Sequence, residues 1–331
     1  MSELRWNPLL GEWVATATHR QDRTFLPPKD FCPLCPTRAG GFPTEVPEPT
    51  YEIVVFENRF PSLLAEPPEP AVTPTDLYRV QRSAGVCEVV LYSPDHGTSL
   101  ARAPVEQIHK LIQVWSDRYR ELGALPYVKY VFIFENKGEE IGVTLHHPHG
   151  QIYAYPFIPP LIQREVDRSA AHHADTGRCL LCDIGDEERR AKGRLVVDND
   201  TFSAYIPFFA RWPYEVHISP RRHVTDLAGF SALETRELAV TLKSVLVGYD
   251  ALFDRSFPYV MALHQRPTGG GDYGHYHFHI ELYPPLRTAS KLKYLAGSEI
   301  GAGMFINDTL AEEKAAELRA KCPPAIFETA Q

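Results

Sequence analysis

The sequence predicts an α+β protein built from two similar halves, residues 1–170 and 171–331. Three features occur in the same order in each half: a CxxC pair, an amphipathic helical pattern, and a strand-like run with alternate histidines. Repetition of several features in one order indicates a duplicated structural unit. The chain of 331 residues is also long enough for two ordinary domains.

The first repeated feature is a pair of cysteines three positions apart. Cys32 and Cys35 form the first pair, and Cys179 and Cys182 form the second. The N-terminal residues lack the basic start and apolar run of an export signal, so we expect a cytoplasmic protein. In that setting the pairs favour metal binding over disulfides. Redox-active cysteines and buried core thiols are the alternatives.

The second repeated feature is a strand-like run that ends in Ser-Pro and a histidine, followed by a helix. The runs end at Ser93-Pro94-Asp95-His96 and at Ser219-Pro220-Arg221-Arg222-His223. The helices are predicted over 105–122 and 232–253, because apolar residues recur there at helical spacing on one face.

Charge and hydropathy exclude some classes of partner. The net charge of −8 argues against a general nucleic-acid binder, which is normally basic. No apolar run reaches the roughly 20 residues that a membrane span needs. An anionic small molecule remains compatible with this charge, since a few arginines in a cleft can outweigh a distant surface field.

Histidines in each half supply the further ligands that a CxxC pair needs to bind zinc, which prefers four thiolate or imidazole ligands in a tetrahedron. His277 is an alternative to His275, because alternate residues of a strand share a face. The sequence predicts one zinc site from Cys32, Cys35, His96 and His147, and a second from Cys179, Cys182, His223 and His275.

The strand-like run 147–153 contains the candidate catalytic residues. His147, His149 and Gln151 are spaced by two, so an extended strand points them to one side. One histidine can then bind metal while its neighbour faces a cleft. A neutral imidazole held there can attack phosphorus, and an amide beside it can donate a hydrogen bond to the phosphoryl oxygen. The alternative is that all three residues are metal ligands.

These motifs resemble the galactose-1-phosphate uridylyltransferase family, a branch of the histidine-triad superfamily, over nearly the whole chain. The most specific segments are Phe134-Glu135-Asn136-Lys137-Gly138, His147-Pro148-His149-Gly150-Gln151, Ser93-Pro94-Asp95-His96 and Tyr283-Pro284-Pro285. The resemblance implies two histidine-triad-like halves, with antiparallel sheets flanked by helices. It also implies a ping-pong reaction in which UDP-glucose gives UMP to the protein and galactose 1-phosphate then takes it.

The resemblance also implies roles for individual residues. His149 would be the nucleophile, Gln151 the phosphoryl hydrogen-bond donor, and the first cysteine–histidine set a structural zinc site. Lys293 and Glu299 would contact the hexose from the partner subunit of a homodimer. The other substrate-binding positions that match are Arg20 and Arg23 for phosphate, with Asn58, Asn136 and Thr144 near the nucleotide.

Some positions depart from the family pattern. Certain members hold a further metal with one glutamate and three histidines, whereas the matching positions here are Glu165, His264, His279 and Glu281. We therefore do not expect that site to form as it does in those members. The second CxxC resembles a two-zinc branch that includes ADP-glucose phosphorylases, so adenylyl transfer to phosphate is the closest alternative. A non-catalytic zinc protein that binds nucleotides and a nucleotide hydrolase are the others.

Overall fold

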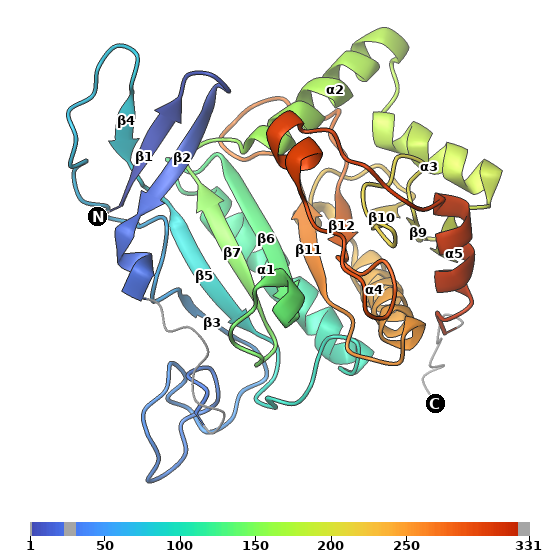
Figure 1. The fold of residues 1–331 in the computed structure, drawn as a ribbon, viewed down its shortest axis with the longest axis horizontal. Coiled ribbons are helices and arrows are strands. Elements are labelled where there is room, and N and C mark those ends of the chain that lie inside the picture. Colours follow the sequence, from blue (N-terminus) through green and yellow to red (C-terminus); the bar gives the residue numbers. More distant parts are fainter. Residues whose placement is uncertain (1, 23–30, 324–331) are drawn as a thin grey trace.

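The structure is a computed structural model that describes residues 2–22 and 31–323 (Figure 1). A small antiparallel sheet near the N-terminus has the strand order β2-β1-β4. It packs against the main sheet, because Leu4 of β1 shares an apolar cluster with Leu63 and with Cys87 of the main sheet. The strands of the small sheet are β1 (Ser2–Asn7), β2 (Glu12–Ala17) and β4 (Val80–Arg82).

One nine-stranded antiparallel sheet forms the centre of the molecule. Its order is β3-β5-β7-β6-β11-β12-β10-β9-β8. The strands in that order are β3 (Val54–Glu57), β5 (Val86–Leu91), β7 (His149–Tyr155), β6 (Tyr130–Lys137), β11 (Tyr259–His264), β12 (His279–Tyr283), β10 (Val216–Pro220), β9 (Phe202–Tyr205) and β8 (Leu195–Asp198).

The strand order shows the internal repeat directly. The first half contributes β5-β7-β6 and the second contributes β11-β12-β10, which is the same arrangement in mirrored order. Strands β6 and β11 join the halves edge to edge, with partners running from Ile133 and Leu263 to Lys137 and Tyr259. The predicted α+β fold with antiparallel strands flanked by helices is confirmed, and a single sheet runs through both halves. The division between residues 170 and 171 stays a prediction.

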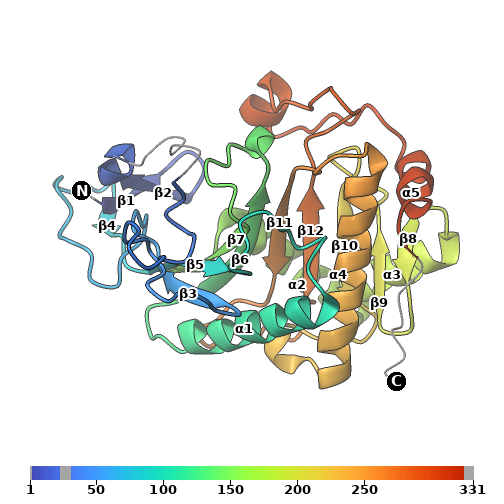
Figure 2. The same cartoon turned by 90° about the horizontal axis from the view of Figure 1, so that it is seen from below.

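Two long helices, α1 (Val105–Gly123) and α4 (Ala232–Leu252), cover one face of this sheet, as Figure 2 shows. Their apolar stripes join the main core, where Trp115 and Leu238 are fully buried. The predicted helical ranges differ from these by one residue at the C-terminal end. Ser231 and Glu234 form a capping box at the start of α4, which satisfies backbone N–H groups that the first helical turn leaves unpaired.

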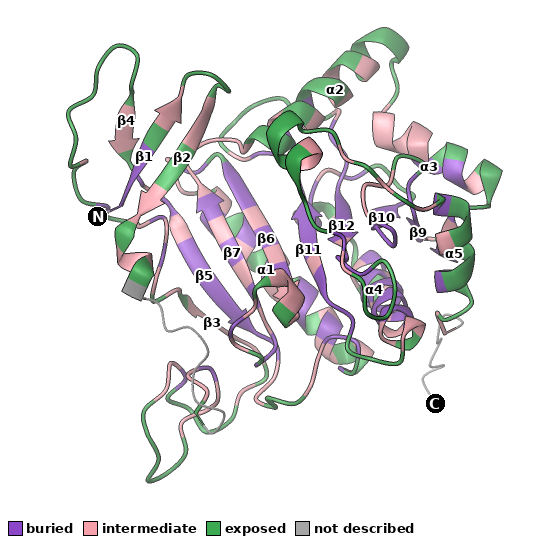
Figure 3. Cartoon of the chain, viewed as in Figure 1, coloured by how far each residue is buried: buried purple, intermediate pink, exposed green. Residues whose placement is uncertain are grey.

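The remaining helices are more peripheral, and Figure 3 shows α2 and the segment around η4 as largely exposed. Within the described parts of the chain, no helix combines the length and apolar character needed to cross a membrane. These elements are α2 (Pro160–Thr176), α3 (Leu180–Ala191) and α5 (Ala311–Arg319), the 3-10 turns η1 (Thr18–Asp22), η2 (Glu139–Ile141) and η3 (Leu227–Gly229), and the π-helical turn η4 (Gly297–Gly301).

Candidate active site

Strand β7 places His149 and Gln151 on the same side of the sheet, as the spacing of two predicts. Buried and half-buried residues alternate along this strand, and both of these side chains belong to the half-buried set. His149 Nδ1 lies 2.8 Å from the backbone oxygen of His147. Because a carbonyl oxygen only accepts, Nδ1 carries the proton of the neutral ring and Nε2 keeps its lone pair. The strand thus fixes the tautomer that a nucleophilic imidazole requires.

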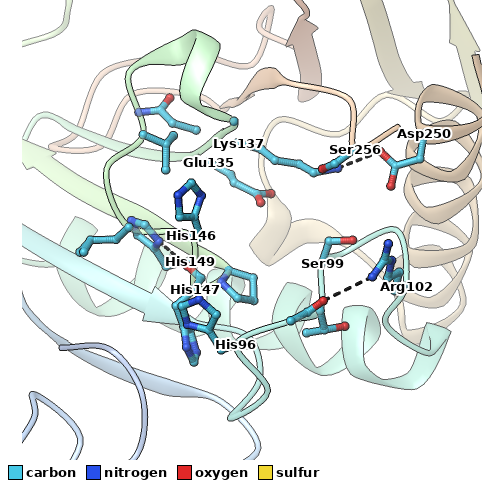
Figure 4. Close-up of a pocket in the computed structure, with 17 residues that line it drawn as sticks. His96, Ser99, Arg102, Glu135, Lys137, His146, His147, His149, Asp250 and Ser256 are labelled. Atoms are coloured by element: carbon cyan, nitrogen blue, oxygen red, sulfur yellow. Dashed lines mark hydrogen bonds and ion pairs between the residues drawn. The ribbon is translucent and has the colours of Figure 1, made fainter. Parts of the chain in front are cut away.

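Two cavities meet at His149. The larger has a volume of about 670 Å³ and is lined by apolar side chains such as Phe56 and Phe60 together with polar ones. The smaller, of about 260 Å³, lies at the end of β6 and includes Lys137 and Asp250, as Figure 4 shows. A histidine shared by two adjacent cavities can contact two parts of one ligand, or two ligands in turn.

The predicted substrate-binding residues fall into four groups, of which three are given first. Arg20, Asn58, Thr144 and Gln151 line the larger cavity, and Asn136 lines the smaller one. Arg23 lies outside the described residues.

The two residues predicted to contact the hexose lie elsewhere. Lys293 Nζ is 3.3 Å from Glu299 Oε1, and both charged groups are largely shielded from solvent. Among the described residues, these two lie outside the linings of both cavities. The chain by itself therefore does not bring them to His149.

A buried carboxyl group that sequence reasoning missed lies beside the smaller cavity. Glu135 is 4% exposed, and its Oε2 accepts a hydrogen bond of 3.2 Å from the hydroxyl of Tyr259. Burial raises the pKa of Glu135 to about 7, although Lys137 and the Tyr259 hydroxyl both lower it. Glu135 belongs to the motif 134–138, in which only Asn136 was expected to lie near the nucleotide. Strand β6 continues through Glu135 to Lys137, and its alternation turns Glu135 inward.

The first predicted metal-binding set comes together as a compact cluster. Cys32, Cys35, His96 and His147 each offer a ligand atom within 4.8 Å of the others. The Sγ atom of Cys35 lies 3.5 Å from Nδ1 of each histidine. His147 Nε2 is 2.8 Å from the backbone oxygen of Ser93, the outer hydrogen bond that usually orients a metal-binding imidazole.

A second cluster has the same design in the other half, with one correction to the prediction. Cys179, Cys182, His223 and His277 converge within 4.8 Å, and His275 is not part of this group. His277 Nδ1 lies 3.5 Å from Cys179 Sγ and 3.3 Å from Cys182 Sγ. The Nε2 atom of His277 is 3.1 Å from the backbone oxygen of Pro220. This contact corresponds to the one between His147 Nε2 and the backbone oxygen of Ser93. The prediction of His275 is therefore replaced by His277.

This correction changes the register of the repeat by two residues. His277 occupies the place of His147, so His279 corresponds to His149 and Glu281 to Gln151. The backbone confirms the match, because His279 Nδ1 is 3.0 Å from the oxygen of His277. The signal that could have found it is the segment after the histidines, Gln151-Ile152-Tyr153 in one half and Glu281-Leu282-Tyr283 in the other.

The second-half counterpart of His149 is enclosed in a charged network. Glu165, His264, His279 and Glu281 gather within 4.8 Å, so the structure does bring these four positions together. His279 is only 5% exposed. Glu281 also lies 3.3 Å from a guanidinium nitrogen of Arg211. Because this histidine is buried among charged partners, the histidine that borders the two cavities is His149 of the first half.

Comparisons with known proteins agree with this architecture. The sequence model of the galactose-1-phosphate uridyl transferase N-terminal domain matches residues 1–159, and that of the C-terminal domain matches residues 165–329. A galactose-1-phosphate uridylyltransferase of Thermotoga maritima is 45% identical, over 96% of this chain and 98% of its own. One of Streptomyces lividans is 41% identical, over 81% of this chain and 71% of its own.

A solved uridylyltransferase structure is similar in three dimensions as well. It superposes with a TM-score of 0.85 at 36% identity and covers 96% of this chain and 98% of its own. The chain belongs to the galactose-1-phosphate uridylyltransferase family, whose members are nucleotidyltransferases.

Proposed function

We propose that this protein transfers UMP from UDP-glucose to galactose 1-phosphate, yielding glucose 1-phosphate and UDP-galactose. The observation that carries the proposal is the tautomer of His149, whose Nδ1 is held by a backbone carbonyl while the side chain borders both cavities. That arrangement suits a nucleophile that serves two substrates in turn.

The transfer occurs in two displacements at phosphorus. In the first, the Nε2 lone pair of His149 forms a bond to the α-phosphorus of UDP-glucose, and the bond from that phosphorus to the oxygen of glucose 1-phosphate breaks. In the second, a phosphate oxygen of galactose 1-phosphate attacks the same phosphorus and the bond to Nε2 breaks. Gln151 and Arg20, in the larger cavity, are positioned to stabilise the added charge on the phosphoryl oxygens. Arg23 is proposed to share that role.

Two zinc ions are proposed, one in each cysteine–histidine cluster. Tetrahedral zinc with bonds of about 2.3 Å to sulfur and about 2.0 Å to nitrogen separates the two kinds of donor by about 3.5 Å. Five of the sulfur–nitrogen separations in the clusters lie between 3.3 Å, for Cys182 and His277, and 3.8 Å, for Cys182 and His223. The residues thus fit zinc, and with four protein ligands each site would be structural.

A homodimer is proposed to complete the active site. Lys293 and Glu299 belong to the segment around η4, which exposes the apolar side chains of Tyr294, Ile300 and Met304. A partner subunit that covered this surface would allow its own Lys293 and Glu299 to reach the hexose. The cytoplasm is the proposed location, because a reducing compartment keeps the four cluster cysteines available as thiolates.

A steady-state assay tests the function. The protein is mixed with UDP-glucose and galactose 1-phosphate at varied concentrations, and release of glucose 1-phosphate is followed. Parallel double-reciprocal plots are expected, together with loss of turnover in the H149A variant. Without a sugar-phosphate acceptor, the proposed reaction releases one glucose 1-phosphate per active site and then stops. Continued release over many turnovers would instead indicate a hydrolase.

Adenylyl transfer from ADP-glucose to inorganic phosphate is the second candidate. The cluster of Cys179, Cys182, His223 and His277 favours it, because the two-zinc branch of the family includes such enzymes. Faster turnover with ADP-glucose and phosphate than with UDP-glucose and galactose 1-phosphate would select this candidate.

A further inference from the structure

The carboxamide of Gln151 is held in one orientation by two neighbours. Asn58 Nδ2 lies 3.3 Å from Gln151 Oε1, and the hydroxyl of Tyr153 lies 3.2 Å from the same oxygen. Both contacts therefore fall on the accepting end of the side chain. Asn58 was expected from the sequence to contact the nucleotide, so a bond to Gln151 gives it a different role.

The direction of the Asn58 bond follows from a backbone group that can only donate. The N–H of Phe60 lies 2.9 Å from one end of the Asn58 carboxamide, and that end must be the oxygen Oδ1. The other end is then the NH₂ group, which faces Gln151. Because an NH₂ group donates, the atom of Gln151 that faces it must be the oxygen. The N–H of Phe60 thus determines which way the carboxamide of Asn58 is turned, and Asn58 in turn determines the orientation of the Gln151 carboxamide.

The position of Asn58 is itself tied to the main sheet. Its backbone N–H donates to the oxygen of Cys87, on β5, over 2.8 Å. Strand β5 pairs with β7 so that Val89 is the partner of Gln151. Asn58 follows directly after β3 and is bonded to β5, the strand next to the one that carries Gln151, so the sheet limits how far the two side chains can separate.

The second half contains an independent version of the tyrosine contact. At the position that corresponds to Gln151, Glu281 accepts a hydrogen bond from the hydroxyl of Tyr283, two residues further along the strand. An ionised carboxylate can only accept, so the tyrosine must be the donor there. The same geometry at Tyr153 makes that hydroxyl a donor to Gln151 Oε1.

We propose that Asn58 and Tyr153 are positioning residues that keep the NH₂ group of Gln151 turned toward the phosphoryl group on His149. With Oε1 directed at these two donors, Nε2 is on the opposite side of the carboxamide. His149 and Gln151 lie on the same side of β7, and both line the larger cavity. This inference rests on the proposed UMP transfer through His149.

The N58D variant tests the proposal because it keeps the size of the side chain and reverses one hydrogen bond. One oxygen of the introduced carboxylate still accepts from the Phe60 N–H, but the other now needs a donor. Gln151 then turns its NH₂ group toward this carboxylate and presents Oε1 to the phosphoryl oxygens. We expect single-turnover UMP transfer from UDP-glucose to slow by about 10-fold to 100-fold, since removal of one preorganised donor has effects of that size or larger.

A double-mutant cycle separates positioning from direct contact. In the Q151A background, N58D is expected to change the transfer rate by less than about 3-fold, because the group on which it acts is absent. Y153F removes one of two donors to Oε1, so its effect is expected to be smaller than that of N58D and to shrink in the Q151A background. The part that remains reports the contact of the Tyr153 hydroxyl with Arg20. If the Q151A variant transfers UMP too slowly to measure, the affinity of each variant for UMP, measured by calorimetry, replaces the rate in the same cycle. Thermal melting identifies any variant that fails to fold.

The possible results separate a failure of the positioning role from a failure of the proposed function. An equal loss from N58D with and without Gln151 would overturn the inference and assign Asn58 to the nucleotide. Unchanged transfer in both N58D and Y153F would overturn it as well. A parent protein that takes up no UMP from UDP-glucose would instead refute the proposed function, before any variant is compared.

Discussion

Replacement of Glu135 by glutamine is predicted to stabilise the protein at alkaline pH. This carboxyl group is 4% exposed, so its ionised form loses most of its contact with water on folding. The hydrogen bond that it accepts from the Tyr259 hydroxyl replaces only part of that hydration. The E135Q variant keeps the shape and an oxygen that accepts from Tyr259. It removes only the negative charge that burial disfavours.

The size and sign of the effect follow from the pKa of Glu135. Burial raises this pKa from 4.5 to about 7, so the folded protein holds a proton that the unfolded chain releases. The stability that this proton provides is fully present below pH 4.5 and is lost as the pH rises through about 7. At about 1.4 kcal/mol per pKa unit, the loss is at most about 3 kcal/mol. The E135Q variant has no carboxyl group at this position, so it does not lose this stability at alkaline pH.

Urea unfolding at several pH values measures the effect. At about pH 8.5 the free energy of unfolding of E135Q is expected to exceed that of the parent, by at most about 3 kcal/mol, and the difference should narrow below about pH 6. The side chain of Glu139 is 72% exposed, so E139Q is the matched control and should change little. An E135Q variant less stable than the parent at alkaline pH, or a difference that does not vary with pH, would refute this reasoning.

The other predictions concern the metal clusters and the nucleophile. H277A is expected to lose one of two zinc ions per chain by elemental analysis, whereas H275A keeps both; loss of zinc from H275A but not from H277A would restore the original assignment. Removal of zinc by a chelator should lower the melting temperature, because binding energy for the folded state is lost, and an unchanged melting curve after confirmed removal would contradict a structural role. UMP transfer should slow as the pH falls, since His149 attacks as a neutral imidazole; a rate that rose steadily toward acid pH would contradict that step.

Local patterns were sufficient to predict the repeat but not the way in which its halves join. The helical spacing of apolar residues in 105–122 and 232–253 located both long helices to within one residue. Strand β6, in contrast, continues as far as Lys137, and no local pattern marks that end. Pairing with β11 accounts for that extension, because Lys137 has Tyr259 as its partner. Such contacts between distant segments are not encoded in local periodicity.

The candidate site could be predicted where a single strand determined the geometry. The spacing of His149 and Gln151 placed both on one side of β7 without further information. The run from His275 to His279 was harder, because three alternate histidines on one face allow two alignments with the first half. The burial of Glu135 was missed for another reason: its inward direction depends on where β6 ends.

Intact-mass measurement after mixing the purified protein with UDP-glucose alone tests the central claim most directly. We predict a gain of one UMP per chain, located on His149 by peptide mapping and absent from H149A. The absence of any adduct in zinc-replete parent protein, with UDP-glucose as with ADP-glucose, would contradict a covalent transfer through this histidine.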